Sequence, residues 1–297
     1  MDAQMLALGA ITLFAATING ALGYGFSSIT VPLALLFLSN RVLNPALIII
    51  EVPLNAYVLW VNRREVGSVW RRCTPMIAGL VPGVLIGTLM VSQVNPDWLK
   101  LCTFTILLPL ILLQAAGIRR QVRSERSAGL AFGAGVGILY SVTTISGPPL
   151  AIALNNQGFE KKEFRAALGL VRLAESSMTG LSYLMYGLFA RESAGLVPWI
   201  VPSVALGVPL GAFLIQRLKA ETFRRLCMSF DAWIVAFGLS KLLRPLRIVE
   251  SNAAFLLLAG VVVLDAWMLY RFFAAQAEAE KAQAASASAS IEVRRSD

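Results

Sequence analysis

Three charged side chains lie inside apolar stretches long enough to cross a membrane, and these are the residues best placed to do chemistry. Glu51 stands in the middle of the stretch from Val42 to Asn62, and Arg172 and Glu175 stand one helical turn apart in the stretch after Lys162. An ionisable side chain inside a membrane is costly and usually functional. We therefore expect Arg172 to add positive potential to an anion path, and Glu51 or Glu175 to take up a proton. The alternative is that Glu51 and Arg172 form a purely structural salt bridge.

Two other apolar stretches are interrupted by small and hydroxyl-bearing residues. They read GALGYGFSSITVP at 20–32 and YSVTTISGPPLAIAL at 140–154. In the first, the glycines permit a tight reversal, and Ser27 or Ser28 could cap a short helix through Ile29 to Leu38. In the second, Pro148 or Pro149 suits the first turn of a helix.

Two helix starts that face each other would offer free N–H groups and positive dipole ends to an anion. The alternative is that both breaks are kinks that let helices pack. The expected substrate-binding residues are Gly23, Gly25, Ser27, Ser28, Thr143, Thr144, Ser146, Gly147 and Arg172.

The composition shows why charged and hydroxyl-bearing residues inside the apolar stretches stand out. The chain has 297 residues, of which 57% are hydrophobic and 14% charged, and its mean hydropathy is +0.69, which indicates an integral membrane protein. Long uncharged runs cover 73–92, 101–118 and 193–216, and still longer ones cover 3–40 and 127–159. Each of the last two exceeds one crossing, so we interpret it as a helical hairpin or a broken helix.

Several classes of function are excluded or unsupported. The chain has no histidine, so His-based catalysis and His metal sites are excluded, and it carries no nucleotide-binding or hydrolase motif. We expect a non-enzymatic protein without metal or cofactor. Its net charge of +9 lies in short loops and reflects topology rather than nucleic-acid binding. Two further acids lie in apolar segments: Asp231 is a proton-coupling candidate, whereas Asp265 suits packing or a subunit contact.

The basic loops predict the orientation, because loops rich in Lys and Arg stay in the cytoplasm. The four loops carry Arg63, Arg64, Arg71 and Arg72; Arg119, Arg120, Arg123 and Arg126; Lys161, Lys162 and Arg165; and Arg217, Lys219, Arg224 and Arg225. This scheme places the N-terminus in the periplasm. An eleventh apolar segment, 252–270, returns the C-terminus to the cytoplasm. A last cluster, Lys241, Arg244 and Arg247, falls on the outer side and disagrees with the scheme.

An internal repeat is the most informative feature of the sequence. The ridge of Gly79, Gly83 and Gly87 recurs as Ser203, Gly207 and Gly211, and small residues at this spacing let membrane helices approach closely. An offset of 121 residues places Arg172 opposite Glu51. Because the basic loops alternate out of phase in the two halves, we predict that the repeats are inverted, as in many secondary transporters.

We accordingly expect an all-α polytopic membrane protein with two inverted-topology repeats, each opening with a broken helix or hairpin. The predicted divisions are an N-terminal repeat (1–125), an inverted C-terminal repeat (126–248), an additional helix (249–273) and a cytoplasmic tail that is disordered after a short helical extension (274–297).

The paired segments NGALGYGFSSITVPLALLF and GAGVGILYSVTTISGPPLAIAL resemble the signatures of the TauE/SafE sulfite exporter family. The resemblance covers about residues 5–245 and implies a transporter for sulfite, organosulfonates such as sulfoacetate, thiosulfate or related anions in a bacterial cytoplasmic membrane. It also implies that the segments around Ser27, Ser28, Thr144, Ser146 and Gly147 line the substrate path. Our hypothesis is proton-coupled export of such an anion by alternating access.

Two other hypotheses stay open at this point: an anion channel, and a membrane assembly factor or sensor partner that transports nothing. The expected partners are a small anionic substrate and membrane lipid, and a homodimer is suggested by the unpaired last segment. The identity of the anion, the direction of transport and the coupling ion leave no mark in one chain.

Overall fold

The computed structural model describes residues 2–22, 25–115, 126–157, 159, 161–214, 220–246, 248–249 and 251–296. Every regular element within these residues is a helix, which confirms the predicted all-α fold. In chain order the elements are α1 (Asp2–Leu22), α2 (Phe26–Ala34), α3 (Asn40–Val61), η1 (Arg63–Glu65), α4 (Val66–Gln93), α5 (Pro96–Ala115), α6 (Arg126–Thr143), α7 (Gly147–Asn156), α8 (Lys161–Met185), α9 (Arg191–Leu214), α10 (Ala220–Leu243), η2 (Asn252–Ala254) and α11 (Phe255–Ser296).

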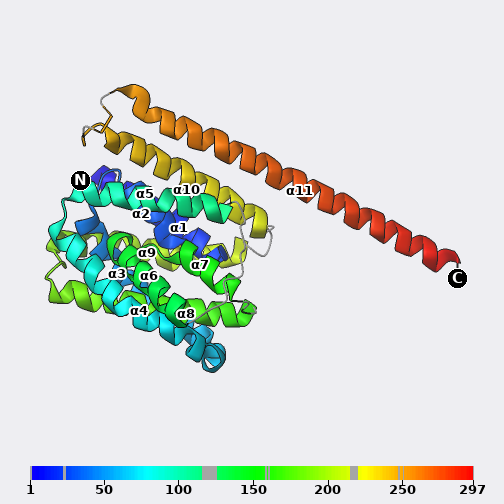
Figure 1. The fold of residues 1–297 in the computed structure, drawn as a ribbon, viewed down its shortest axis with the longest axis horizontal. Helices are drawn as coiled ribbons and strands as arrows, with labels where there is room; N and C mark the ends of the chain where they lie inside the picture. The colour runs from blue at the N-terminus through cyan, green and yellow to red at the C-terminus, as the bar shows by residue number, and fades with distance from the viewer. Residues whose placement is uncertain are drawn as a thin grey trace.

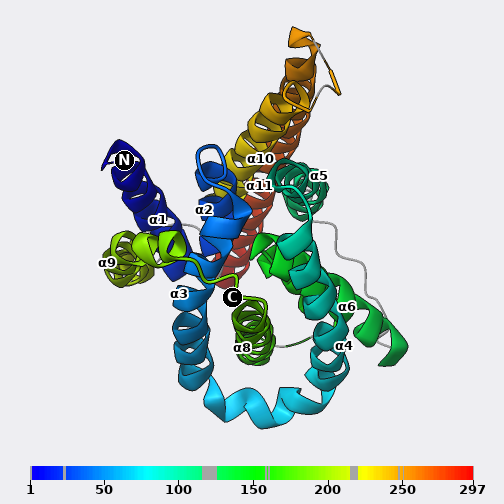
Figure 2. The ribbon, with the colours of Figure 1, turned by 90° about the vertical axis from the view of Figure 1, so that its left-hand side faces the viewer.

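Seven helical segments among the described residues are long and apolar enough to cross a membrane. They lie in α1, α3, α4, α5, α9, α10 and α11, and this number makes the protein a multi-pass membrane protein. The long helix α8 is not among them, because its buried face carries charged and hydroxyl-bearing side chains, including Arg172 and Glu175. Seen end-on, α8 lies inside the bundle between α3 and α4 (Figure 2).

Both predicted breaks are present. A short helix follows a long one in each half, α2 after α1 and α7 after α6. With nine and ten residues, α2 and α7 are each about 14–15 Å long, roughly half of a bilayer's hydrocarbon core. Neither short arm can cross the membrane as a helix, so each half opens with one long and one short arm.

The small-residue ridges pack as predicted. A β-carbon added at Gly83 would lie 2.1 Å from the carbonyl oxygen of Ala134 on α6, and one at Gly211 would lie 1.8 Å from that of Thr17 on α1. Both distances are far below van der Waals contact, so only glycine permits the observed approach. Ser203, in the same ridge as Gly211, donates a hydrogen bond to the Gly9 carbonyl oxygen at 3.0 Å. The result is two closely packed helix pairs, α4 with α6 and α1 with α9 (Figure 2).

The two pairs are equivalent, because in each one the fourth helix of one half packs on the first helix of the other half. In the first pair α4 packs on α6, and in the second α9 packs on α1. The third helices, α3 and α8, cross in opposite directions: Gly169 approaches Leu59, and Gly180 approaches Ile48. Antiparallel third helices are what inverted halves require. The inversion across a membrane, and the domain divisions drawn from it, stay predictions.

Three apolar cores surround the crossing of α3 and α8. The largest includes buried side chains of α1, α2, α3, α5, α9 and α10, and the second those of α4, α6, α7 and α8. A small third core contains Ile48, Val91, Leu99, Val142 and Tyr183. The crossing itself is polar, so the apolar cores hold in place a seam that would not be stable alone in lipid.

The N-terminal half of the last helix packs on α10 and η2, as far as Gln276, whose side chain hydrogen-bonds Thr222, and the helix then extends well beyond the bundle (Figure 1). A buried ion pair joins the two helices, Arg225 Nη2 to Asp265 Oδ1 at 2.7 Å. Asp265 therefore contacts its own chain, and Arg225, predicted in a loop, lies within α10. The helix continues to Ser296, where we expected disorder after a short extension; its many alanines and glutamates favour a helix.

The end of the molecule where α3 meets η1 and α8 begins, called the basic end below, is more helical than expected. Arg63 and Arg64 belong to η1, and Arg71 and Arg72 to the first turns of α4, so the predicted loop is a tight helical corner. Other predicted loop residues lie outside the described residues, namely Arg119, Arg120, Arg123, Arg217, Lys219 and Arg247.

Candidate functional site

A stripe of buried polar side chains runs along α3. Asn40, Asn44, Glu51 and Asn55 lie at spacings of four, seven and four residues, which puts them on one helical face, and each is at most 2% exposed. The facing helix α8 has a similar stripe. Its members are Arg172, Glu175, Ser176, Thr179 and Ser182. The two stripes meet where α3 and α8 cross, near the midpoint of both helices.

The predicted ion pair of the two halves is present. Arg172 Nη2 lies 3.5 Å from Glu51 Oε1, and both side chains are buried. Ser27 from the first turn of α2 donates a hydrogen bond to the same carboxylate oxygen, and Tyr140 from α6 donates one to Oε2. Four helices thus contribute directly to the surroundings of one carboxylate.

The second glutamate has a matching partner in the other half. Ser146, immediately before α7, donates a hydrogen bond to Glu175 Oε1. Ser27 and Ser146 are 119 residues apart, close to the offset between the halves, so the two serines occupy equivalent places. In each half, therefore, a serine within one residue of the start of the short helix donates a hydrogen bond to a glutamate on the third helix.

Two atoms of this cluster have no hydrogen-bond partner among the described residues, Glu175 Oε2 and Arg172 Nε. Buried polar atoms are rarely left unpaired, because each unpaired atom costs free energy. Here one is an acceptor and the other a donor on the same face of α8. The Glu175 oxygen can accept a proton or a hydrogen bond, and the Arg172 Nε–H can donate a hydrogen bond to a small anion.

The charges of the cluster do not balance. When both glutamates are ionised, two carboxylates face one guanidinium, and all three side chains are buried. An uncompensated charge in a medium of low dielectric constant is strongly unfavourable. The cluster therefore favours either one added proton or a rearrangement that exposes a carboxylate.

The second short helix begins as predicted, with Pro148 and Pro149 in its first turn, but the first does not follow the predicted capping pattern. The N-cap of α2 is Gly25, with φ of 108°, and no side chain caps the helix. The prediction that Ser27 or Ser28 is the cap, and that the helix runs to Leu38, is wrong: α2 begins at Phe26 and ends at Ala34. Glycine adopts the left-handed conformation at no steric cost, so it sets the start of the helix and leaves Ser27 available to Glu51.

The break between α6 and α7 is held by backbone and asparagine contacts. Thr144 there has φ of 55°, a strained conformation for a β-branched residue, and it corresponds in spacing to Gly25. Thr143 Oγ1 accepts a hydrogen bond from the Ile145 N–H at 3.0 Å. Asn44 Nδ2 donates to the Val142 carbonyl oxygen at 2.7 Å, which ties the break to α3.

The structure thus brings five predicted residues into contact or close proximity, namely Ser27, Glu51, Ser146, Arg172 and Glu175. Thr143 and Thr144 are buried beside them, but their hydroxyls bind local backbone atoms. Ser28 is buried, Gly25 and Gly147 lie at the starts of the short helices, and Gly23 lies outside the described residues. Their roles toward a substrate stay predictions.

Asp231 does not join this cluster. It is buried in α10, within the apolar surroundings of that helix, and its Oδ1 has no hydrogen-bond partner among the described residues. Its proposed part in proton coupling stays a prediction without a contact to Arg172 to support it.

Sequence reasoning missed Tyr140, Asn44, Asn55 and Ser176. Asn55 Nδ2 donates to the Arg172 carbonyl oxygen and to Ser176 Oγ, both at 3.3 Å, and so joins the two stripes. The signal was present, because polar residues at helical spacing in an otherwise apolar segment predict a buried polar face. Tyr140 could have been found as a polar residue in the segment YSVTTISGPP, one helical turn before the break at Thr144.

Comparison with known proteins gives one match. Residues 8–238 match the sequence model of a family described as sulfite exporter TauE/SafE. The match spans both halves and ends within α10, before α11. Searches of curated proteins and of solved structures gave no match. No group of residues that could hold a metal ion occurs in the part of the chain that the structure describes.

Proposed function

This chain belongs to the TauE/SafE sulfite exporter family, and so is a membrane transporter of sulfur-containing anions and not an enzyme; we propose that it carries a small sulfur oxyanion by alternating access, coupled to protons. The candidate substrates are sulfite, an organosulfonate such as sulfoacetate, and thiosulfate. We place it in a bacterial cytoplasmic membrane, with its C-terminus in the cytoplasm. The direction, export, is taken from the family's description.

One observation carries the proposal: the buried Arg172 pairs with the buried Glu51 and lies one helical turn from the buried Glu175, and each glutamate accepts a hydrogen bond from a serine at the start of a short helix. An oxyanion can replace a carboxylate as the partner of Arg172, because guanidinium groups bind both in the same planar geometry. The positive ends of the α2 and α7 dipoles add to this attraction.

Coupling between anion and proton follows because the anion and the Glu51 carboxylate compete for Arg172. When the anion takes Arg172, Glu51 loses its counter-charge and remains buried with only Ser27 and Tyr140 as donors. Protonation of Glu51 removes the unpaired charge, and Glu175 offers an unpaired oxygen as a second proton acceptor. Anion and proton would therefore cross together, so the outward gradient of the anion would drive export and an inward proton gradient would oppose it. When the anion leaves, the proton leaves and Glu51 pairs with Arg172 again.

Alternating access would be achieved by movement of the two short helices relative to the crossing of α3 and α8. The breaks at Gly25 and Thr144 provide the hinge positions, since both backbones adopt the left-handed conformation. A channel would need an open path, whereas the buried cluster of the described residues has no exposed carboxylate. We therefore favour a carrier over a channel.

The test is flux in proteoliposomes. Sulfite, sulfoacetate, taurine, thiosulfate and sulfate are each supplied with and without an imposed proton gradient, to the wild type and to Ser27→Ala/Ser146→Ala. Ser92→Ala serves as a matched control, because its hydroxyl binds only the Leu89 carbonyl oxygen of its own helix. We expect saturable flux that depends on the gradient in the wild type and control, and a large loss in the double variant.

Absence of flux for every anion, with folded protein, would reject the proposal and favour the role of an assembly or sensor partner. Flux that does not saturate and ignores the proton gradient would favour a channel. A homodimer through α11 stays a prediction, which sedimentation in detergent would test.

A further inference from the structure

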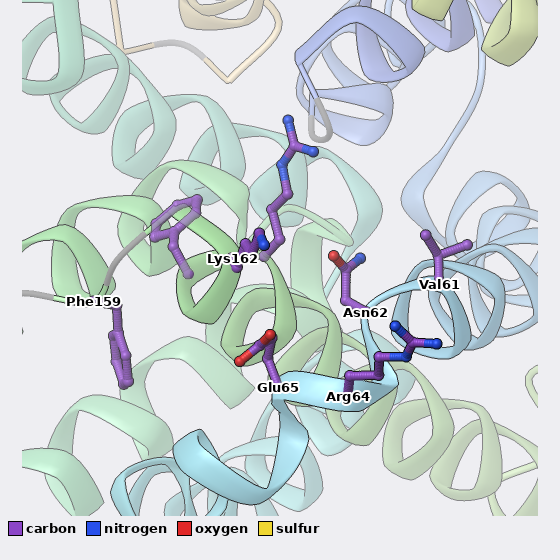
Figure 3. A pocket seen from close by; sticks show the side chains of 8 residues that line it. Val61, Asn62, Arg64, Glu65, Phe159 and Lys162 are labelled. Atoms are coloured by element: carbon purple, nitrogen blue, oxygen red, sulfur yellow. The ribbon is translucent and has the colours of Figure 1, made fainter.

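A wide cavity opens at the end of the molecule where α3 meets η1 and α8 begins. Its volume is about 740 Å³, and its wall includes Asn62, Arg64, Glu65, Phe159, Lys162 and Arg165. Figure 3 shows Arg64 and Asn62 on one side and Phe159 on the other, with Glu65 and Lys162 between them. The lining side chains thus come from both halves of the protein.

This cavity is positively charged. Three cationic side chains, Arg64, Lys162 and Arg165, line it together with one carboxylate, Glu65. A fourth cation stands behind the wall, because the Arg72 guanidinium lies 3.9 Å from the centre of the Phe159 ring. A cleft with charges of one sign concentrates ions of the opposite sign and speeds their association.

A second cavity continues from the first toward the buried cluster. It has a volume of about 290 Å³ and shares Val61, Asn62, Phe164 and Arg165 with the outer one. Its inner wall includes Asn19 of α1 and Leu54 of α3. Leu54 lies one helical turn from Glu51, so the two cavities follow α3 from the basic end and stop about one turn short of the cluster, whose residues do not line them.

Asn19 gives the inner cavity a polar group that can bind a ligand. The side chain is 6% exposed, and its Oδ1 has no hydrogen-bond partner among the described residues. A buried amide oxygen without a partner is unfavourable unless a ligand or water supplies a hydrogen. The amide also carries a donor group, so it can bind an oxyanion that bears both an oxygen acceptor and a hydrogen.

We propose that these two cavities form the entrance for substrate from the basic end, where Arg64, Lys162 and Arg165 hold a small sulfur oxyanion before it passes Asn19 to Arg172. The inference rests on the proposed function, which it extends by naming the face of entry and the residues that collect the anion. The basic end is the predicted cytoplasmic side, so this is the loading side of an exporter.

The test compares anion flux in right-side-out and everted membrane vesicles. The variant Arg64→Gln/Lys162→Gln/Arg165→Gln removes three exposed cations. The control is Arg191→Gln, which removes an exposed cation at the start of α9, beyond the far end of α8. We expect the triple variant to raise KM about tenfold at low salt in everted vesicles only, with the maximal rate unchanged. High salt should raise the KM of the wild type and reduce this difference. Asn19→Leu should raise KM in the same vesicles.

Each failure can be told apart. A wild type that moves none of the sulfur anions rejects the proposed function, and the entrance with it. A wild type that transports, with a triple variant whose KM is unchanged in both vesicle types or raised equally in both, rejects the entrance alone. An effect of Arg191→Gln as large as that of the triple variant would also reject it.

Discussion

Removal of Arg172 should destabilise the protein and abolish transport, and the two effects can be separated. In Arg172→Met the Glu51 carboxylate stays fully buried, with hydrogen bonds from Ser27 and Tyr140 but no counter-charge. Removing one partner of a buried ion pair typically costs about 3–5 kcal/mol. Because both hydrogen bonds remain and each is worth about 1.5–3 kcal/mol to a charged group, we expect a loss near 3 kcal/mol.

A second substitution then tests whether the ion pair of Glu51 and Arg172 serves transport or only stability. Glu51→Gln in the Arg172→Met background removes the stranded charge and keeps a side chain of similar shape. We expect this double variant to regain most of the lost stability, with a coupling energy of about 2 kcal/mol. It should not regain transport, because no guanidinium remains to bind the anion.

The assays are chemical denaturation in detergent for the free energy of unfolding, and flux in proteoliposomes for transport. Arg191→Met, at an exposed arginine, is the control and should change neither. Two results would refute the reasoning. A loss below about 1 kcal/mol in Arg172→Met would mean that Glu51 is not held as a buried charge. A double variant that transports would mean that the ion pair is only structural.

Three further predictions concern the elements around this cluster. Gly83→Ala should destabilise the protein by about 1–3 kcal/mol, because its β-carbon would lie 2.1 Å from the Ala134 carbonyl oxygen. The control Gly135→Ala, whose β-carbon would have no atom within 4 Å, should be neutral or stabilising, and chemical denaturation of both variants checks this. Thr144→Gly should stabilise the protein by about 1 kcal/mol by relieving a left-handed threonine, and Gly25→Ala should destabilise it; a loss of stability in Thr144→Gly would contradict the assigned strain. Asp265→Asn removes the ion pair with Arg225, so it should weaken the contact between α10 and α11 and make α11 more sensitive to limited proteolysis than in the control Glu278→Gln. Equal cleavage rates in the two variants would show that the Arg225–Asp265 pair does not hold α11 in place.

Much of the fold could be predicted from the sequence, because the signals were chemical and periodic. Uncharged runs located the long helices, glycine and proline located the breaks at Gly25 and near Pro148, and the glycine ridges predicted the close helix pairs. The offset between halves correctly paired Glu51 with Arg172.

The details that failed depend on tertiary contacts. Ser27 has the right residue type for a cap, but the left-handed Gly25 is the N-cap, so Ser27 lies inside the first turn and donates its hydroxyl hydrogen to Glu51. The offset of 121 residues matches Glu51 to Arg172. It therefore could not identify Glu175, which lies about one helical turn after Arg172, as the partner of Ser146. The cavities at the basic end depend on how α3, η1 and α8 meet, which no single segment encodes.

The most direct test of the account is the number of protons taken up when the anion binds. Calorimetric titration of detergent-purified protein with thiosulfate or sulfoacetate, in buffers of different ionisation enthalpy at near-neutral pH, gives this number. We predict an uptake of about one proton per anion, because an anion that replaces Glu51 at Arg172 leaves a buried carboxylate that must be neutralised. Uptake should fall toward zero in Glu51→Gln/Glu175→Gln. Tight binding of the anion to the wild type without proton uptake would contradict the competition at Arg172 on which the mechanism depends.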